Sequence, residues 1–170
     1  MTPTATRKTR LLAQAGVIAA VHAAATVAVL QMPAQLGWGP VQLRLSEALT
    51  VVALFTPAAV PGLALGTALG NASMVAQVGA VGLLDVIAGS LATLLGAWWT
   101  WRFRAHTALA LAGPVVSNAL IVPIYLPVLL AAAGLGNVPL FGVDPRDGWL
   151  IVYAAGVLTV GVGQALVVYG

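Results

Sequence analysis

Cysteine is absent from this chain of 170 residues, and charged side chains make up only 6% of it. Without cysteine, disulfides, thiolate metal sites and thiol nucleophiles are excluded. Lys8 is the only lysine, and neither a GxxxxGK[ST] phosphate loop nor an HExxH pattern occurs. The chain therefore does not hydrolyse ATP through such a loop. No Ser/His/Asp or paired-carboxylate constellation stands out either, so we expect no catalytic residue, no metal and no cofactor.

Apolar residues dominate what is present, at 61% of the sequence and a mean hydropathy of +1.02. Apolar stretches of about 20 residues recur through the chain, which predicts an all-α integral membrane bundle of six transmembrane helices. Residues 1–170 are expected to form a single transmembrane domain. The predicted helices cover residues 11–30, 46–56, 60–76, 81–101, 108–133 and 149–170.

The second predicted helix is short, but the distribution of basic residues favours counting it as a span. With six spans, five basic residues lie on the cytoplasmic side under the positive-inside rule. These residues are Arg7, Lys8, Arg10, Arg102 and Arg104. Membrane anchoring thus explains the net charge of +3 without nucleic-acid binding. We expect a multi-pass protein of the bacterial plasma membrane with both termini cytoplasmic.

The scarce polar residues converge towards the outer side of the predicted bundle. An ionisable group at the centre of a membrane helix costs about 2.5–3.5 kcal/mol and is rarely kept without a role. The segment GPVQLRLSEALTVVALFTP, residues 39–57, holds several of these groups. A pocket open to the outside would explain the clustering, and polar bonds between helices are the alternative. The candidate substrate-binding residues are Trp38, Gln42, Arg44, Ser46, Glu47, Asn71, Asp85, Asn118, Tyr125 and Tyr153.

Small residues recur at four-residue spacing in two of the predicted helices. Ala15, Ala19 and Ala23 form one row, and a glycine row occupies positions 62, 66 and 70. Such rows let helix backbones approach closely. The glycine row is interpreted as holding the bundle together, and the alanine row as a docking surface for another membrane protein. His22 stands alone and is interpreted as a packed or interface side chain.

Three segments carry a resemblance to a known family. They are GPVQLRLSEALTVVALFTPAAVPGL from residue 39, LLDVIAGSLATLLGA over residues 83–97 and SNALIVPIYL over residues 117–126. Together they resemble the QueT family of queuosine-precursor transporters, from the first predicted helix to about residue 170. One departure is Gln164, at a position where related sequences carry glutamate.

The resemblance implies a small six-helix membrane protein that serves as the substrate-binding S component of an energy-coupling-factor (ECF) transporter. Its substrate would be a 7-deazaguanine such as queuine or its aminomethyl or cyano relative. Its partners would be membrane lipids, a transmembrane coupling subunit and two ATPase subunits. The resemblance also places Gln42, Arg44, Ser46 and Glu47 in the family signature, and the alanine row on the face that docks on the coupling subunit.

Chemistry suggests roles for several of these side chains. The carboxylate of Glu47 can accept hydrogen bonds from the N1 and 2-amino edge of a guanine-like base. Asp85 could pair with an exocyclic amine, and Tyr125, Tyr153 or Trp38 could stack on the ring. Arg44 could instead form a salt bridge with Glu47. The alternatives are an S component for another vitamin, a stand-alone facilitator, or an intramembrane enzyme that uses Glu47 and Asp85 as acid and base.

Overall fold

The computed structural model describes residues 3–31, 44–136, 143–144 and 147–170. Within these ranges every element is a helix, which confirms the predicted all-α bundle. The longer elements are α1 (Pro3–Leu30), η1 (Leu45–Leu54), α3 (Ala59–Val78), α4 (Ser90–Arg102), α5 (Thr107–Ala132) and α6 (Trp149–Tyr169). Two short elements, η2 (Gly79–Gly82) and η3 (Asp85–Gly89), lie between α3 and α4.

Four helical segments in the described part of the chain are long and apolar enough to cross a membrane. They are Thr6–Leu30, Ala59–Gly82, Thr107–Ala132 and Trp149–Tyr169. The segment Leu45–Leu54 is apolar but shorter. It is a 3-10 helix, and its 10 residues extend about 20 Å at ~2.0 Å per residue, short of a ~30 Å hydrocarbon core.

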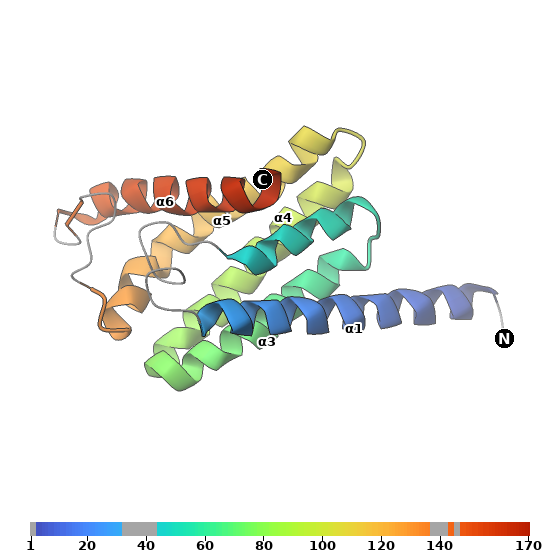
Figure 1. Cartoon of the computed structure of the whole chain (residues 1–170), viewed down its shortest axis with the longest axis horizontal. Coiled ribbons are helices and arrows are strands. Elements are labelled where there is room, and N and C mark those ends of the chain that lie inside the picture. Colours follow the sequence, from blue (N-terminus) through green and yellow to red (C-terminus); the bar gives the residue numbers. More distant parts are fainter. Residues whose placement is uncertain (1–2, 32–43, 137–142, 145–146) are drawn as a thin grey trace.

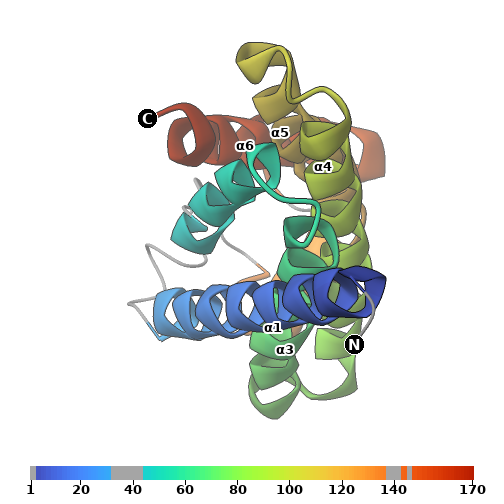
Figure 2. The ribbon, with the colours of Figure 1, turned by 90° about the vertical axis from the view of Figure 1, so that its right-hand side faces the viewer.

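The helices pack in chain order around η1. Contacts join α1 to α3, α3 to α4, α4 to α5, and α5 to α6. The two views in Figures 1 and 2 place η1 between α1 and α6, and it also contacts α4. Figure 1 shows the start of α1 and the turn between α4 and α5 at the right-hand end of the bundle, and the η2 turn and the start of α6 at the left-hand end.

The glycine row of α3 brings α1 close to the rest of the bundle. A methyl group on Gly62 would lie 2.8 Å from the carbonyl oxygen of Ala15, and one on Gly66 would lie 2.7 Å from that of Ala19. Glycine leaves room for the backbones to approach. As a result Ala19 is only 3% exposed, against α3. These contacts agree with the interpretation of the glycine row as a packing surface.

The helix expected over residues 81–101 is divided in the structure. Gly79 ends α3 with a φ of +68°, a left-handed conformation that favours glycine. The chain then forms the 3-10 turn η2 and the π-turn η3 before α4 begins at Ser90. A π-turn widens the backbone locally and is frequent at functional sites. Here it contains Asp85, which is fully buried.

Candidate functional site

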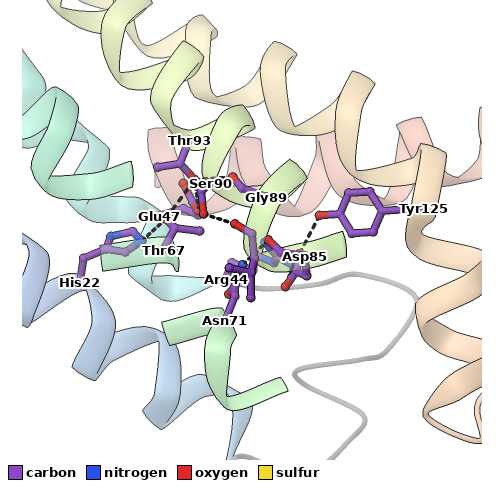
Figure 3. A network of polar contacts seen from close by, with 11 residues as sticks. His22, Arg44, Glu47, Thr67, Asn71, Asp85, Gly89, Ser90, Thr93 and Tyr125 are labelled. Carbon is purple, nitrogen blue, oxygen red and sulfur yellow. Dashed lines mark hydrogen bonds and ion pairs between the residues drawn. The ribbon is translucent and has the colours of Figure 1, made fainter. Parts of the chain in front are cut away.

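The carboxylate of Asp85 is the centre of a polar network that joins separate parts of the chain (Figure 3). Arg44 Nη2 donates to Oδ1 at 3.1 Å and to Oδ2 at 3.3 Å. The hydroxyl of Tyr125 donates to Oδ1 at 2.6 Å. The side-chain amide of Asn71 donates to the backbone carbonyl of Asp85 at 3.0 Å. Asp85 therefore ties η3 to α3, to α5 and to the residue that precedes η1.

Arg44 stands at the start of η1 with 20% of its side chain exposed. Removal from water lowers the pKa of its guanidinium, but the attraction of the Asp85 carboxylate outweighs this effect and raises the pKa above its ordinary value. Arg44 is thus a fixed positive charge paired with Asp85. The sequence interpretation that paired Arg44 with Glu47 is not what the structure shows, because the ion pair is with Asp85.

Glu47 lies in the first turn of η1 and is 1% exposed. Thr93 Oγ1 donates to its Oε1 at 3.3 Å, and Thr50 Oγ1 donates to its backbone carbonyl at 2.7 Å. The other carboxylate oxygen, Oε2, has no hydrogen-bond partner among the described residues. A buried carboxylate oxygen without a donor is costly. Oε2 is therefore a buried acceptor that lacks a donor among the described residues.

The 3-10 geometry of η1 explains why Glu47 faces inward. Side chains three residues apart nearly eclipse one another in a 3-10 helix, so positions 47, 50 and 53 share one face. Glu47, Thr50 and Ala53 are all buried. An α-helix, which the sequence analysis expected here, would rotate these three positions progressively apart.

A chain of hydroxyl groups extends from Glu47 to α1. Thr93 Oγ1 lies 3.1 Å from Thr67 Oγ1, which lies 3.0 Å from His22 Nε2. All four side chains are buried, and Figure 3 draws them beside the Asp85 network. We call His22, Thr67, Thr93 and Glu47 the hydroxyl relay. It links α1, α3, α4 and η1 through side chains alone.

Gly89 stands where the hydroxyl relay and the Asp85 network meet. Its carbonyl oxygen lies 3.1 Å from Thr93 Oγ1. A methyl group on Gly89 would lie 2.9 Å from Asp85 Oδ1 and 3.0 Å from Asn71 Nδ2. Both distances are too short for a side chain to fit without moving these groups. Because Gly89 has no side chain, the Asp85 carboxylate and the Asn71 amide can both lie close to this turn of the helix.

Two open grooves of about 420 Å³ each lie elsewhere on the molecule. One is lined by Gln14 of α1 and Thr56 after η1, among others, and the second by Leu150 and Leu158 of α6. Neither includes a buried carboxylate in its lining, so neither is the candidate site. Among the described residues, no three His, Asp or Glu side chains lie close enough together to hold a metal ion.

Comparison with protein families decides the class of the protein. The model of the QueT transporter family matches residues 12–170, nearly the full chain. The chain belongs to the QueT transporter family. Comparisons with curated proteins and with solved structures gave no match. The family and the four apolar helices together make this a multi-pass membrane protein that transports.

In this QueT transporter the structure brings together four of the residues singled out from the sequence. Arg44, Asn71, Asp85 and Tyr125 share the Asp85 network. Each of the four comes from a different element or loop. The hydrogen bonds of Glu47 run instead to Thr93 and Thr50, so Glu47 belongs to the hydroxyl relay.

The remaining candidates lie outside these contacts or outside the described residues. Ser46 is buried beside Glu47 in η1. Asn118 donates to Pro114 within its own helix, and Tyr153 donates to the carbonyl of Leu120 and stacks on Trp149. Trp38 and Gln42 lie outside the described residues. The roles suggested for these residues in this QueT transporter stay predictions.

Sequence reasoning missed Thr67, Thr93 and Gly89, and it left His22 without a role. A signal was available for two of them, because Asp85, Gly89 and Thr93 follow one another at four-residue spacing, which places them on one face of a helix. Threonine in a membrane helix usually bonds to its own backbone, so its hydroxyl alone gives little indication of a site.

Proposed function

We propose that this QueT family member is the substrate-binding S component of an ECF transporter and takes up a 7-deazaguanine precursor of queuosine. Such a ring presents adjacent N–H donors at N1 and at the 2-amino group, and a carboxylate can accept from both. The observation that carries the proposal is the buried, unpartnered Oε2 of Glu47, next to an oxygen that holds a single long hydrogen bond from Thr93.

Asp85 would complete the recognition from the other side of Gly89. Its Oδ1 already accepts from Tyr125 and Arg44, while its Oδ2 has only a 3.3 Å contact with Arg44. An exocyclic amine of the ligand could approach that oxygen. The remaining predicted ligand contacts, from Gln42, Trp38, Asn118 and Tyr153, belong to the same proposal and would supply stacking and further hydrogen bonds.

The proposed orientation places both termini in the cytoplasm. The start of α1 and the turn between α4 and α5 lie at the same end of the bundle in Figure 1. Basic residues occur in the first part of α1, and Arg102 ends α4 shortly before Arg104. This supports a cytoplasmic location for that end under the positive-inside rule. Arg44 and Asp85 then belong towards the opposite, outer end, where a substrate would arrive.

Energy would come from partner subunits, since the sequence contains no phosphate loop. The proposed docking element is α1, whose outward face carries exposed Leu12, Val17 and Val21. Ala15 and Ala23 are partly exposed, but the backbones of Ala15 and Ala19 both lie close to α3. The docking surface would therefore combine the margins of the alanine row with the apolar face next to it, and lipid would cover the other apolar faces.

Equilibrium binding of radiolabelled queuine and its aminomethyl and cyano relatives to the purified protein tests the substrate. We expect saturable binding of at least one of them. Replacing Glu47 by Gln should weaken that binding by more than about tenfold, because hydrogen bonds to a charged group contribute roughly 1.5–3 kcal/mol. Asp147→Asn, which neutralises an exposed carboxylate before α6, is the matched control and should leave the affinity unchanged.

Saturable binding of an unrelated vitamin, with none of the three deazaguanines, would reassign the substrate. An unchanged affinity in Glu47→Gln would remove Glu47 from the site. Co-purification tests the partners: the tagged chain should bring down a membrane subunit and two ATPase subunits from its native membrane. Substrate uptake by vesicles that contain this chain alone would instead favour a facilitator.

A further inference from the structure

The two threonines of the hydroxyl relay each have more acceptors than protons. Thr93 Oγ1 lies 3.3 Å from Glu47 Oε1 and 3.1 Å from the Gly89 carbonyl. Thr67 Oγ1 lies 3.1 Å from Thr93 Oγ1 and 3.0 Å from the Leu63 carbonyl. A hydroxyl carries one proton and can accept two hydrogen bonds. The direction of each bond in the relay is therefore decided by its neighbours.

The contact between Thr93 and Glu47 sets that direction. In this contact Thr93 Oγ1 donates its single proton to Oε1, and the Gly89 carbonyl receives none from it. Thr93 then has no proton left for Thr67 and must accept from it, and Thr67 in turn must accept from His22 Nε2. His22 then carries its proton on Nε2, which leaves Nδ1 as a bare acceptor. In the structure Nδ1 is buried and has no partner among the described residues.

We infer that His22, Thr67 and Thr93 are positioning residues that hold the Glu47 carboxylate with Oε2 directed at the ligand. The inference rests on the proposed function and assigns to these three residues a part in it. The donors of the relay act in sequence, from His22 to Thr67, from Thr67 to Thr93 and from Thr93 to Oε1. Oε1 therefore has a donor, while Oε2 has none among the described residues. A carboxylate held in this way loses less side-chain freedom when the ligand binds.

The relay also connects α1 to the proposed binding site, because His22 of α1 acts on Glu47 through Thr67 and Thr93. His22 reaches Thr67 because α1 lies close to α3 at Gly66, where a methyl group would come within 2.8 Å of the His22 Cβ. Thr67 and Gly66 are neighbours in the chain. The same turn of α3 therefore allows α1 to approach, at Gly66, and binds the His22 side chain, at Thr67. The same helix supplies the proposed docking face.

A double-mutant cycle tests the positioning role. Thr93→Val removes the hydroxyl and keeps the shape, and it should weaken deazaguanine binding about tenfold, the loss expected for one hydrogen bond to a charged group. In a Glu47→Gln background the same change should alter affinity less than about twofold, because the two residues act through one interaction. Thr67→Val should follow the same pattern with a smaller loss.

Two variants separate positioning from general damage to the fold. Thr93→Ser restores the hydroxyl and should bind like the wild type. Thr159→Val removes a buried hydroxyl of α6 that bonds only to its own helix, and it should leave affinity unchanged. Additive losses in the cycle, or a Thr93→Val protein that binds like the wild type, would overturn the inference.

The state of His22 gives a readout that needs no ligand. The chain has two histidines, so His106→Gln leaves His22 as the only one. Nitrogen-15 NMR of the labelled imidazole in unliganded protein should show the form protonated on Nε2 alone. A form protonated on Nδ1 would reverse the bond to Thr67 and overturn the relay.

The outcomes distinguish this inference from the proposed function. If the wild-type protein binds none of the three deazaguanines, the proposed substrate fails, while the His22 spectrum still tests the direction of the relay. If the wild type binds one tightly and Thr93→Val binds equally well, the substrate stands and the positioning role fails.

Discussion

Asp85 and Glu47 are both buried carboxylates, but their oxygens are satisfied to different degrees. Asp85 has an arginine, a phenol and an amide on its carboxylate and backbone. Among the described residues, the Glu47 carboxylate has one hydroxyl donor, on one of its two oxygens. A buried ion pair with full hydrogen bonding resists disturbance, whereas an open oxygen is available for exchange. Asp85 thus stabilises the fold and keeps only Oδ2 for the proposed exocyclic amine, whereas Glu47 suits a ligand contact through Oε2.

Asp85→Asn should lower stability, because it leaves the Arg44 guanidinium without its counter-charge. We expect a loss on the order of 1–3 kcal/mol, smaller than for a fully buried pair since Arg44 keeps some exposure. Thermal unfolding of the detergent-solubilised protein measures it as a lower Tm.

The double variant Asp85→Asn with Arg44→Gln is the control for that experiment. Removing both charges should cost less than the sum of the two single changes, because neither partner is then left alone. Equal Tm values for the wild type and Asp85→Asn would show that the ion pair does not stabilise the bundle.

The turn that contains Gly89 makes a second prediction possible. Gly89→Ala would place a methyl group 2.9 Å from the Asp85 carboxylate, so it should disturb the network, lower the Tm and weaken substrate binding. Gly161→Ala is a matched control in α6, where the new methyl meets only Ala119 Cβ at an ordinary 3.5 Å. Gly161→Ala should keep the affinity and hold or raise the Tm, since alanine favours helix.

A Gly89→Ala protein with wild-type affinity and Tm would mean that the η3 turn can shift without cost. Both variants replace a helical glycine by alanine, so they share the effect of alanine on helix stability. Measuring them in the same detergent leaves the contact with Asp85 as the difference between them.

Hydrophobicity was enough to predict the helices but not their winding. Long apolar segments specify four membrane-length helices, since each exceeds the span of the hydrocarbon core. The 3-10 form of η1 and the π-turn at Asp85 depend on packing against several neighbours, which a single sequence does not display.

The candidate site was predictable where a residue was costly to keep in a membrane. Charge and scarcity marked Arg44, Glu47 and Asp85, and the structure pairs Arg44 with Asp85 and buries Glu47 against Thr93. Thr67 and Thr93 carry no such mark, because a threonine hydroxyl can bond to its own helix in any membrane protein. The sequence suggested a pair between Arg44 and Glu47, its near neighbour in the chain, whereas the structure pairs Arg44 with Asp85, which lies 41 residues away.

The absence of cysteine allows the orientation of the bundle to be measured directly. Single substitutions Thr6→Cys, His106→Cys and Asp147→Cys each place one thiol at an exposed position. In intact cells a membrane-impermeant maleimide should label the variant at position 147 only. The other two should react after lysis, since the positive-inside rule places that end in the cytoplasm.

The cysteine-free parent chain is the control for background labelling. Labelling of the His106→Cys variant in intact cells, with protection at position 147, would invert the proposed orientation. It would also move the Asp85 network to the cytoplasmic side and remove the outward route to the site.

The near contact between Gly66 and the Ala19 carbonyl restricts how this chain can be recombined with its relatives. Where two helix backbones pack without intervening side chains, the small residues of one helix must lie opposite those of the other. Neither helix can therefore be replaced on its own by an unrelated apolar segment. A chimera that imports a foreign N-terminal helix would have to import the third helix with it. Substitutions at the two positions are therefore expected to arise as compensating pairs.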